Sequence, residues 1–263
     1  MNETALRRPA GGSISKTHMK FSLDGGTAGR CRIGLIVLAT DHTIEAEWRH
    51  VIRLPGVAFY ESRISNSPEI NPTTLAAMEK DLGKSAAVIL PGTKLDVIGY
   101  GCTSASVVLG EETVAGRIQE ARPGVAVTNP ITAAITGMKK MGAKRIALLT
   151  PYIEEVNQRF RGYIEARGLE VTVMGSFNHE NDNEVARIDT ASIRNAMIEL
   201  GREPTVDGIF VSCTSLRVAD IAEDVEKATG KPVTSSNLAL AWHCLRLAGV
   251  DDAIPGFGRL FRS

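Results

Sequence analysis

The chain has 263 residues, 43% of them hydrophobic and 23% charged, which is enough for one large domain or two small ones with buried cores. Thirty basic residues balance thirty acidic residues, so we expect no nucleic-acid partner. No apolar run is long enough to span a bilayer and no secretory signal opens the chain, so we expect a cytoplasmic protein with no membrane partner.

The beginning of the chain has the composition of a flexible segment. Residues 1–30 are rich in Gly, Ser and Thr, and they show no hydrophobic periodicity. We therefore predict a flexible tail over these residues, with the folded part of the chain after it.

From residue 31 onward, the chain carries the same series of short apolar runs twice. Four runs recur in the same order, and the offset between the copies falls gradually from 113 to 106 residues. Such runs are typical of strands buried on both faces of a parallel sheet. The repetition predicts two similar halves. The matched runs are Arg32–Leu38 with Arg145–Pro151, Gly56–Tyr60 with Gly168–Thr172, Asp96–Cys102 with Asp207–Cys213, and Val127–Thr128 with Val233–Thr234.

Helical patterns separate these runs, and the alternation predicts an α/β fold. We expect two doubly wound, parallel four-stranded (Rossmann-like) domains, related by a pseudo-twofold axis. The first domain should comprise residues 31–128 together with 237–263, and the second residues 129–236. The predicted helices include residues 44–51, 72–85, 154–167, 191–200 and 238–247.

Each half places a cysteine directly after its third apolar run. Cys102 and Cys213 are each followed by Thr-Ser, which we expect to open a helix. Ligands of open α/β sheets bind beyond the carboxyl ends of the strands, so the two thiols should face one cleft between the domains. Because a helix N-terminus stabilises a thiolate, we expect both thiols to have lowered pKa values and to act as catalytic residues.

The other two cysteines have the surroundings of core residues. Cys31 begins an apolar strand, and Cys244 lies on the apolar helix 238–247. A lone cysteine of this kind is usually a small buried hydrophobe. No two cysteines have metal-ligand spacing, so we expect free thiols and no metal site.

Several polar residues follow predicted strands and are therefore candidates for substrate binding. Structural alternatives exist for most of them: Asp41 can cap the helix 44–51, the Thr-Ser pairs can cap helices, and Tyr152 can be a core aromatic. Asp182 lies in a loop that is polar throughout. The complete set is Asp41, His42, Thr103, Ser104, Tyr152, Asp182, Thr214 and Ser215.

Motifs for other chemistries are missing from the sequence. It contains no dinucleotide-binding glycine motif, no P-loop, no nucleophile elbow and no zinc-protease motif. Hydride transfer, phosphoryl transfer and triad hydrolysis therefore have no support.

The two cysteine motifs resemble those of the aspartate/glutamate racemase superfamily. The segments Gly-Tyr-Gly-Cys102-Thr-Ser, Val-Ser-Cys213-Thr-Ser and Leu149-Thr-Pro-Tyr152 carry the likeness, together with the opening Arg32-Ile-Gly-Leu-Ile-Val. The branch that it resembles contains maleate isomerases, arylmalonate decarboxylases and ectoine-utilisation proteins, and the last are the most similar around Asp41. The resemblance implies two Rossmann-like domains, a site at their interface and no metal or organic cofactor. It also implies a homodimer, which is the commonest oligomer.

The same resemblance bears on the substrate. Arylmalonate decarboxylases keep only the second cysteine, whereas this chain has both, as racemases and isomerases do. Maleate isomerases hold a substrate carboxylate with an asparagine at the position of Asp41, and a second asparagine falls near Asp182. An aspartate repels a carboxylate but attracts an ammonium or amidinium group. These features favour a small amino acid or an ectoine-like carboxylic acid as substrate.

Three functions follow from these residues. The first is a cofactor-independent racemase or epimerase that moves a proton next to a carboxylate between two thiols. The second is a cis-trans isomerase that adds Cys102 covalently to the double bond of a small unsaturated dicarboxylate. The third is a two-lobed small-molecule binding protein without catalytic activity.

Overall fold

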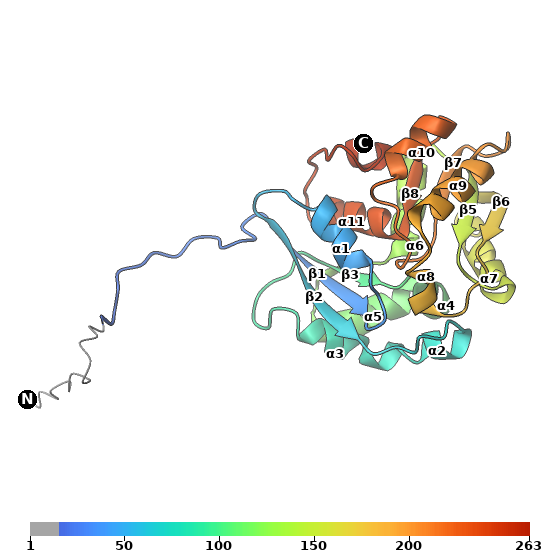
Figure 1. Cartoon of the computed structure of the whole chain (residues 1–263). Coiled ribbons are helices and arrows are strands. Elements are labelled where there is room, and N and C mark those ends of the chain that lie inside the picture. The colour runs from blue at the N-terminus through green and yellow to red at the C-terminus, as the bar shows by residue number, and fades with distance from the viewer. Residues whose placement is uncertain (1–15) are drawn as a thin grey trace, which may run out of the picture.

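The computed structural model describes residues 16–263 and contains two four-stranded parallel sheets (Figure 1). The first sheet has the strand order β2-β1-β3-β4 and the second the order β6-β5-β7-β8, so the two halves share one topology. The predicted duplication and the α/β fold class are confirmed. The strands are β1 (Cys31–Leu38), β2 (Val57–Ile64), β3 (Val97–Gly101), β4 (Ala126–Thr128), β5 (Arg145–Thr150), β6 (Glu170–Ser176), β7 (Gly208–Val211) and β8 (Val233–Ser235).

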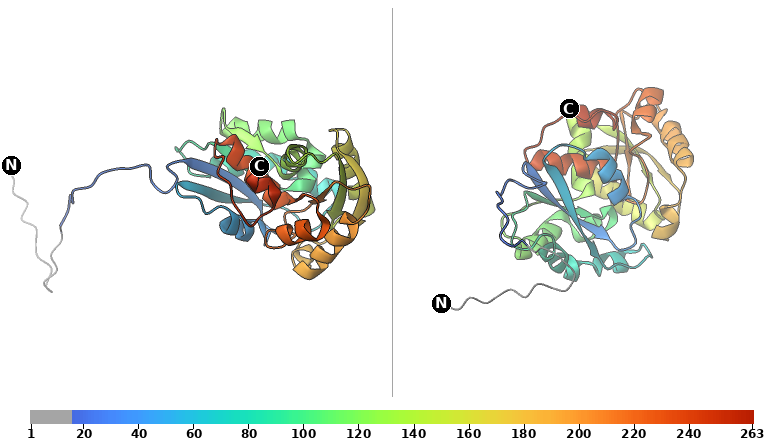
Figure 2. Two further views of the ribbon diagram at one scale, coloured as in Figure 1. Left: turned by 90° about the horizontal axis from the view of Figure 1, so that it is seen from above. Right: turned by 60° about the vertical axis from the view of Figure 1, so that its left-hand side comes forward.

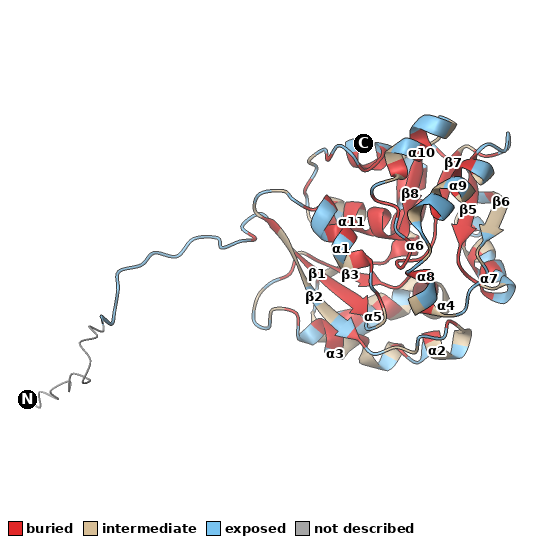
Figure 3. Ribbon diagram, viewed as in Figure 1, coloured by how far each residue is buried: buried red, intermediate tan, exposed pale blue. Residues whose placement is uncertain are grey.

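Helices cover both faces of each sheet, and their outer faces are the exposed part of the molecule (Figure 3). The central strands are almost wholly buried, as their continuous apolar sequences require. The helices are α1 (Ile44–Val51), α2 (Pro72–Ala76), α3 (Leu82–Ala87), α4 (Thr103–Leu109), α5 (Glu111–Ala121), α6 (Pro130–Lys140), α7 (Glu154–Glu165), α8 (Asp182–Val185), α9 (Thr190–Gly201), α10 (Ala222–Thr229) and α11 (Ser236–Leu247), with short 3₁₀ helices at Glu79–Asp81 and Arg259–Arg262.

Most predicted helices occur within a few residues of their expected bounds. The predicted helix 72–85 is different, because it divides into α2, a 3₁₀ turn and α3. Asn71 caps α2 and accepts hydrogen bonds from the N–H groups of Thr73 and Thr74, but the α-helix ends after only five residues. The apolar residues Leu75 and Met78 are nevertheless buried, so the spacing predicted the buried face correctly but not the continuity of the helix.

Two long helices join the halves. Helix α6 follows β4 of the first sheet yet contacts β7 and β8 of the second, whereas α11 follows β8 yet contacts β1, β3 and β4 of the first. The two helices also pack against each other, so each half contributes one helix that packs against the sheet of the other half. The domain boundaries near residues 129 and 237 stay a prediction.

Residues 1–15 of the predicted tail lie outside the described residues. Residues 16–30 form no helix or strand, and the first of them extend away from the sheets (Figure 2). The last residues before β1 contact the fold, because Ala28 is buried and the N–H of Arg30 donates to Gly56 O at 2.8 Å. Within residues 16–263, no helix has the length and apolar character needed to cross a membrane.

Candidate active site

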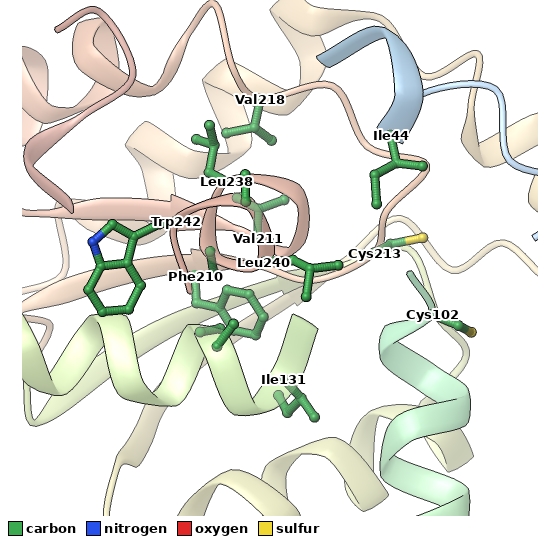
Figure 4. Close-up of a cluster of buried hydrophobic side chains, with 14 of the residues drawn as sticks. Ile44, Cys102, Ile131, Phe210, Val211, Cys213, Val218, Leu238, Leu240 and Trp242 are labelled. Atoms are coloured by element: carbon green, nitrogen blue, oxygen red, sulfur yellow. The ribbon is translucent and has the colours of Figure 1, made fainter. Parts of the chain in front are cut away.

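The two cysteine loops meet at the carboxyl ends of β3 and β7. The sheet register pairs Val37 with Gly101 in the first half and Leu149 with Val211 in the second, so the chain leaves both sheets at the same level. Cys102 follows at once, and Cys213 follows one residue later. Figure 4 shows both side chains at the edge of a cluster of buried apolar residues, with their sulfurs pointing away from that cluster.

Both thiols line one small cavity between the halves. Its free volume is about 20 Å³, which is room for about one water molecule. The lining residues are Leu38, Asn66, Ser67, Glu69, Ile70, Thr74, Leu75, Met78, Cys102, Thr103, Ser104, Tyr152, Asp182, Cys213 and Thr214.

Cys102 is the N-cap residue of α4. Its backbone is extended, with φ −141°, and its Sγ accepts a hydrogen bond from the backbone N–H of Ala105 at 3.4 Å. The hydroxyl of Ser104 lies 3.7 Å from the same sulfur. The predicted helix after this cysteine is therefore present, and its first turn contacts the thiol.

Cys213 lies in a different conformation. Its φ is +137°, a value that side-chain-bearing residues rarely adopt, and its N–H donates to Ser236 Oγ at 3.0 Å. The helix predicted directly after Cys213 is wrong: residues 214–221 form turns, and α10 begins only at Ala222. Side chains from elsewhere in the fold pair with backbone groups of this loop instead: Glu47 accepts the N–H groups of Val218 and Ala219, and Asn237 donates to Thr214 O.

The prediction that both thiols have lowered pKa values is also wrong. Burial raises the pKa of Cys102 to about 11, although the N–H of Ala105 and the hydroxyl of Ser104 oppose the rise. Burial raises the pKa of Cys213 further, and the nearby charge of Asp182 adds to the effect. Desolvation of the thiolate outweighs the few donors around each sulfur, so both groups are neutral thiols at neutral pH.

Asp182 connects the two halves at this cavity. Its Oδ2 accepts a hydrogen bond from Thr40 Oγ1 at 2.6 Å, and its Oδ1 accepts one from Ser215 Oγ at 2.8 Å. The backbone N–H of Asp182 also donates to Pro68 O at 3.0 Å, and the N–H of Ile70 donates to Glu180 O at 3.0 Å. The loops after β2 and β6 therefore pair with each other over the cavity.

Asp41 does not line the cavity and is almost wholly buried. Its Oδ1 accepts hydrogen bonds from the N–H groups of Thr43 at 2.7 Å and Ile44 at 2.9 Å, so it caps the start of α1. Its Oδ2 has no hydrogen-bond partner among the described residues. Burial raises the pKa of Asp41 to about 6, although the two N–H groups oppose the rise.

The structure does not bring all the predicted residues into the cavity. Cys102, Thr103, Ser104, Tyr152, Asp182, Cys213 and Thr214 line it, whereas Asp41, His42 and Ser215 do not. Ser215 instead binds Asp182. His42 is exposed, and its Nε2 lies 2.9 Å from Asn183 Oδ1.

Sequence reasoning missed the segment after β2, which contributes Asn66, Ser67 and Ile70 from its loop and Thr74 from α2 to the cavity. The signal was available, because this loop follows a strand end just as the cysteine loops do. Cys31 and Cys244 are buried away from this cavity, as predicted.

The charged residues that line the cavity are all acidic. Asp182 and Glu69 line it, Asp41 lies beside it, and no Lys or Arg is among the lining residues. Within residues 16–263, no three His, Cys, Asp or Glu side chains lie close enough together to hold a metal ion.

The comparison with known families agrees with this site. The family model described as arylmalonate decarboxylase matches residues 55–261. The chain belongs to the arylmalonate decarboxylase family. This confirms the predicted branch of the racemase superfamily, whereas the particular similarity to ectoine-utilisation proteins stays a prediction.

Relatives in this family include enzymes with two different activities. The chain is 36% identical over 179 residues to the arylmalonate decarboxylase of Bordetella bronchiseptica, covering 67% of this chain and 71% of that one. It is 28% identical over 242 residues to the maleate isomerase of Pseudomonas putida, covering 87% and 96%.

A solved structure extends the comparison to the fold. A cysteine-to-serine mutant of the Nocardia farcinica maleate cis-trans isomerase, with a covalently bound succinylcysteine intermediate, superposes with a TM-score of 0.81 and 28% identity. The match covers 88% of this chain and 98% of that one.

Proposed function

We propose that this chain is a cofactor-independent racemase or epimerase that uses Cys102 and Cys213 on a small carboxylic acid. The observation that carries the proposal is that both thiols line one cavity, on loops from two different sheets. A base on one face of a carbon atom and an acid on the opposite face are what inversion requires. In the reacting form one of the two thiols would first lose its proton to solvent. This thiolate would remove the proton next to the carboxylate, and the other thiol would deliver a proton to the opposite face.

The raised pKa values of the two thiols make their thiolates stronger bases, as removal of a proton from carbon requires. A carbon acid next to a carboxylate is weakly acidic, and a thiolate with a conjugate pKa of about 11 is a stronger base than an ordinary cysteine thiolate. Charge develops on the carboxylate oxygens as the proton leaves. The hydroxyls of Thr103, Ser104 and Tyr152, which line the cavity, are the donors available to stabilise that charge.

The charge of the site favours a substrate that also carries a cationic group. Asp182 lines the cavity and is buried, and the carboxylate of Asp41 is buried outside the lining. An ammonium or amidinium group in the cavity would compensate the charge of Asp182 directly and that of Asp41 at longer range. We therefore propose an amino acid or an ectoine-like cyclic amidine as the substrate, rather than a simple dicarboxylate.

A second candidate function is cis-trans isomerisation of a small unsaturated dicarboxylate. It is favoured by the likeness to the Nocardia farcinica isomerase structure, which contains a succinylcysteine. In this reaction the thiolate of Cys102 would add to one carbon of the double bond, and the electron pair would move onto the adjacent carboxylate. After rotation about the new single bond, the electron pair would return and expel the thiolate.

The experiment that separates the two is turnover in deuterium oxide. Chiral amino acids, an ectoine-like amidine and maleate would each be incubated with the protein and followed by proton NMR and chiral chromatography. The proposal expects deuterium at the carbon next to the carboxylate together with inversion. The variant Cys244→Ala, which changes a buried thiol outside the cavity, should react as the wild type does. Conversion of maleate to fumarate, without reaction of any amino acid or amidine, would refute the racemase proposal and support the second candidate.

A further inference from the structure

Cys213 has the most strained backbone among the described residues that carry a side chain. Four such residues have positive φ, and three of them lie between 44° and 58°, in the left-handed helical region. Cys213 lies at 137°, in a region that is essentially restricted to glycine. A residue stays in such a conformation only where its surroundings hold it there.

Two adjacent side chains at the start of α11 hold the backbone on either side of Cys213. Ser236 Oγ accepts the N–H of Cys213 at 3.0 Å, and Asn237 Nδ2 donates to the carbonyl oxygen of Thr214 at 2.8 Å. Both side chains are buried, with exposed fractions of 0% and 1%. Loss of either one would leave a backbone group of this loop buried without a partner, which is costly.

Further contacts fix these two side chains. Asn237 Nδ2 also donates to Glu47 Oε2 at 2.7 Å, which determines how its amide is oriented. The other oxygen of Glu47 accepts the N–H groups of Val218 at 2.6 Å and Ala219 at 2.7 Å, so the same carboxylate holds the later part of the loop. Burial raises the pKa of Glu47 to about 6, and these donors oppose the rise.

Ser236 also reaches the other cysteine loop. Its Oγ lies 2.8 Å from the hydroxyl oxygen of Thr103, the residue directly after Cys102. One buried hydroxyl thus bonds to Cys213 and to the neighbour of Cys102. This arrangement fixes the two loops relative to each other, which a reaction shared between two thiols requires.

We propose that Ser236 and Asn237 are positioning residues for Cys213: they hold its strained backbone so that the thiol faces Cys102 across the cavity. The inference rests on the proposed function, because positioning matters where both thiols act on one substrate. Neither residue lines the cavity, so they act through Cys213 and not on the substrate.

The experiment compares two adjacent serines at the start of α11: Ser236, its first residue, and Ser235, its N-cap. Ser236→Ala removes the acceptor of the Cys213 N–H. Ser235→Ala removes only the helix cap, since Ser235 Oγ accepts the N–H of Leu238 at 3.2 Å. Both serines are fully buried, so the pair is matched in residue type and burial. Each variant and the wild type would be labelled with a small uncharged alkylating agent, and the rate at each of the four cysteines would be measured by mass spectrometry.

Ser236→Ala should release Cys213 from its strained conformation into a more solvated one. We expect the labelling rate of Cys213 to rise about tenfold or more, because the thiolate is then less desolvated, with Cys102 changed by less than about threefold. On the substrate identified by deuterium exchange, kcat should fall roughly 30-fold or more with little change in KM. Ser235→Ala should lower the melting temperature and leave the ratio of the Cys213 and Cys102 labelling rates unchanged.

Two results would overturn the proposal. One is a Cys213 to Cys102 labelling ratio in Ser236→Ala that equals the ratio in Ser235→Ala. The other is faster labelling of Cys31 and Cys244 together with Cys213, because that would indicate general loosening. If Ser236→Ala does not fold, Ser236→Cys keeps a weaker acceptor, and Asn237→Ala tests the other contact. The labelling needs no turnover, so an inactive wild type would refute the proposed function and still leave the positioning measurable.

Discussion

The two cysteine loops occupy equivalent places in a duplicated fold, yet they are built differently. Cys102 has an ordinary extended backbone and starts a helix in which one N–H, that of Ala105, contacts its sulfur. Cys213 has φ +137°, no helix after it, and a backbone held by side chains from α11. The sheets of the two halves keep the same order while the loops diverge. Topology therefore places both thiols, but the local contacts differ and give the two sulfurs different environments.

The largest effect is expected when either loop loses its thiol. Cys102→Ala and Cys213→Ala should each lower racemisation by roughly 10³-fold or more, because each thiol serves one face of the carbon. Each variant should still exchange the α-proton of one enantiomer with deuterium, without inversion. Chiral chromatography and proton NMR together measure both. Exchange of both enantiomers by a single-thiol variant would rule out one thiol for each face.

The next effect concerns the negative charge of Asp41, near the cavity that both cysteine loops line. Asp41→Asn should lower kcat/KM for a cationic substrate about tenfold or more, since a buried negative charge near the substrate's cationic group is lost. The same substitution should raise kcat/KM for a dicarboxylate, because the repulsion between Asp41 and the substrate's carboxylates is removed. Asp189→Asn, which changes the N-cap of α9 away from the cavity, is the control.

Asp41 also has a consequence for stability. Its pKa is about 6 in the folded protein and lower in the unfolded chain, so the folded state binds its proton more tightly. The contribution of Asp41 to the free energy of unfolding therefore falls as the pH rises from about 4 to 6, and it remains at its lower value above pH 6. Asp41→Asn should be more stable than the wild type by about 1 to 3 kcal/mol at pH 8, and the difference should disappear near pH 4. Urea unfolding at several pH values measures this, and an equal difference at pH 4 and pH 8 would contradict it.

A smaller effect should separate the two thiols themselves. Burial raises the pKa of Cys102 to about 11 and that of Cys213 further, so the thiolate fraction of both rises with pH throughout the neutral range. Alkylation should therefore accelerate about tenfold per pH unit between pH 7 and 10, with Cys102 about tenfold faster than Cys213. Rates resolved for each cysteine by mass spectrometry test this. A plateau below pH 8 would mean that one loop stabilises its thiolate far more than the contacts above imply.

The strands and their order were predictable because a buried parallel sheet leaves a continuous apolar pattern, and here the pattern occurs twice. The position of Cys102 and Cys213 at the strand ends followed from the same pattern. The helix after Cys213 was predicted from its likeness to the first copy. The likeness gave no sign of Glu47, Ser236 and Asn237, which are distant in sequence. Their side chains hydrogen-bond to the backbone of the loop after Cys213, which forms no helix there.

The thiol pKa values were mispredicted for a related reason. Sequence indicates that Cys102 precedes a helix, and the N–H of Ala105 does contact its sulfur. Sequence does not indicate how deeply the loop is buried, and the exposed fractions of Cys102 and Cys213 are only 2% and 5%. At such burial, desolvation dominates over a single helix turn.

The smallest effect tests the strain at Cys213 directly. At φ +137° a glycine is unstrained and an alanine is not, so Cys213→Gly should be more stable than Cys213→Ala by about 1 kcal/mol or more. Cys244 provides the opposite case, because it lies inside helix α11, where glycine is less stable than alanine by about 1 kcal/mol. Urea unfolding of the four variants should therefore give opposite orders at the two positions. If alanine is the more stable residue at both, Cys213 is not strained, and the difference between the two cysteine loops lies in their hydrogen bonds alone.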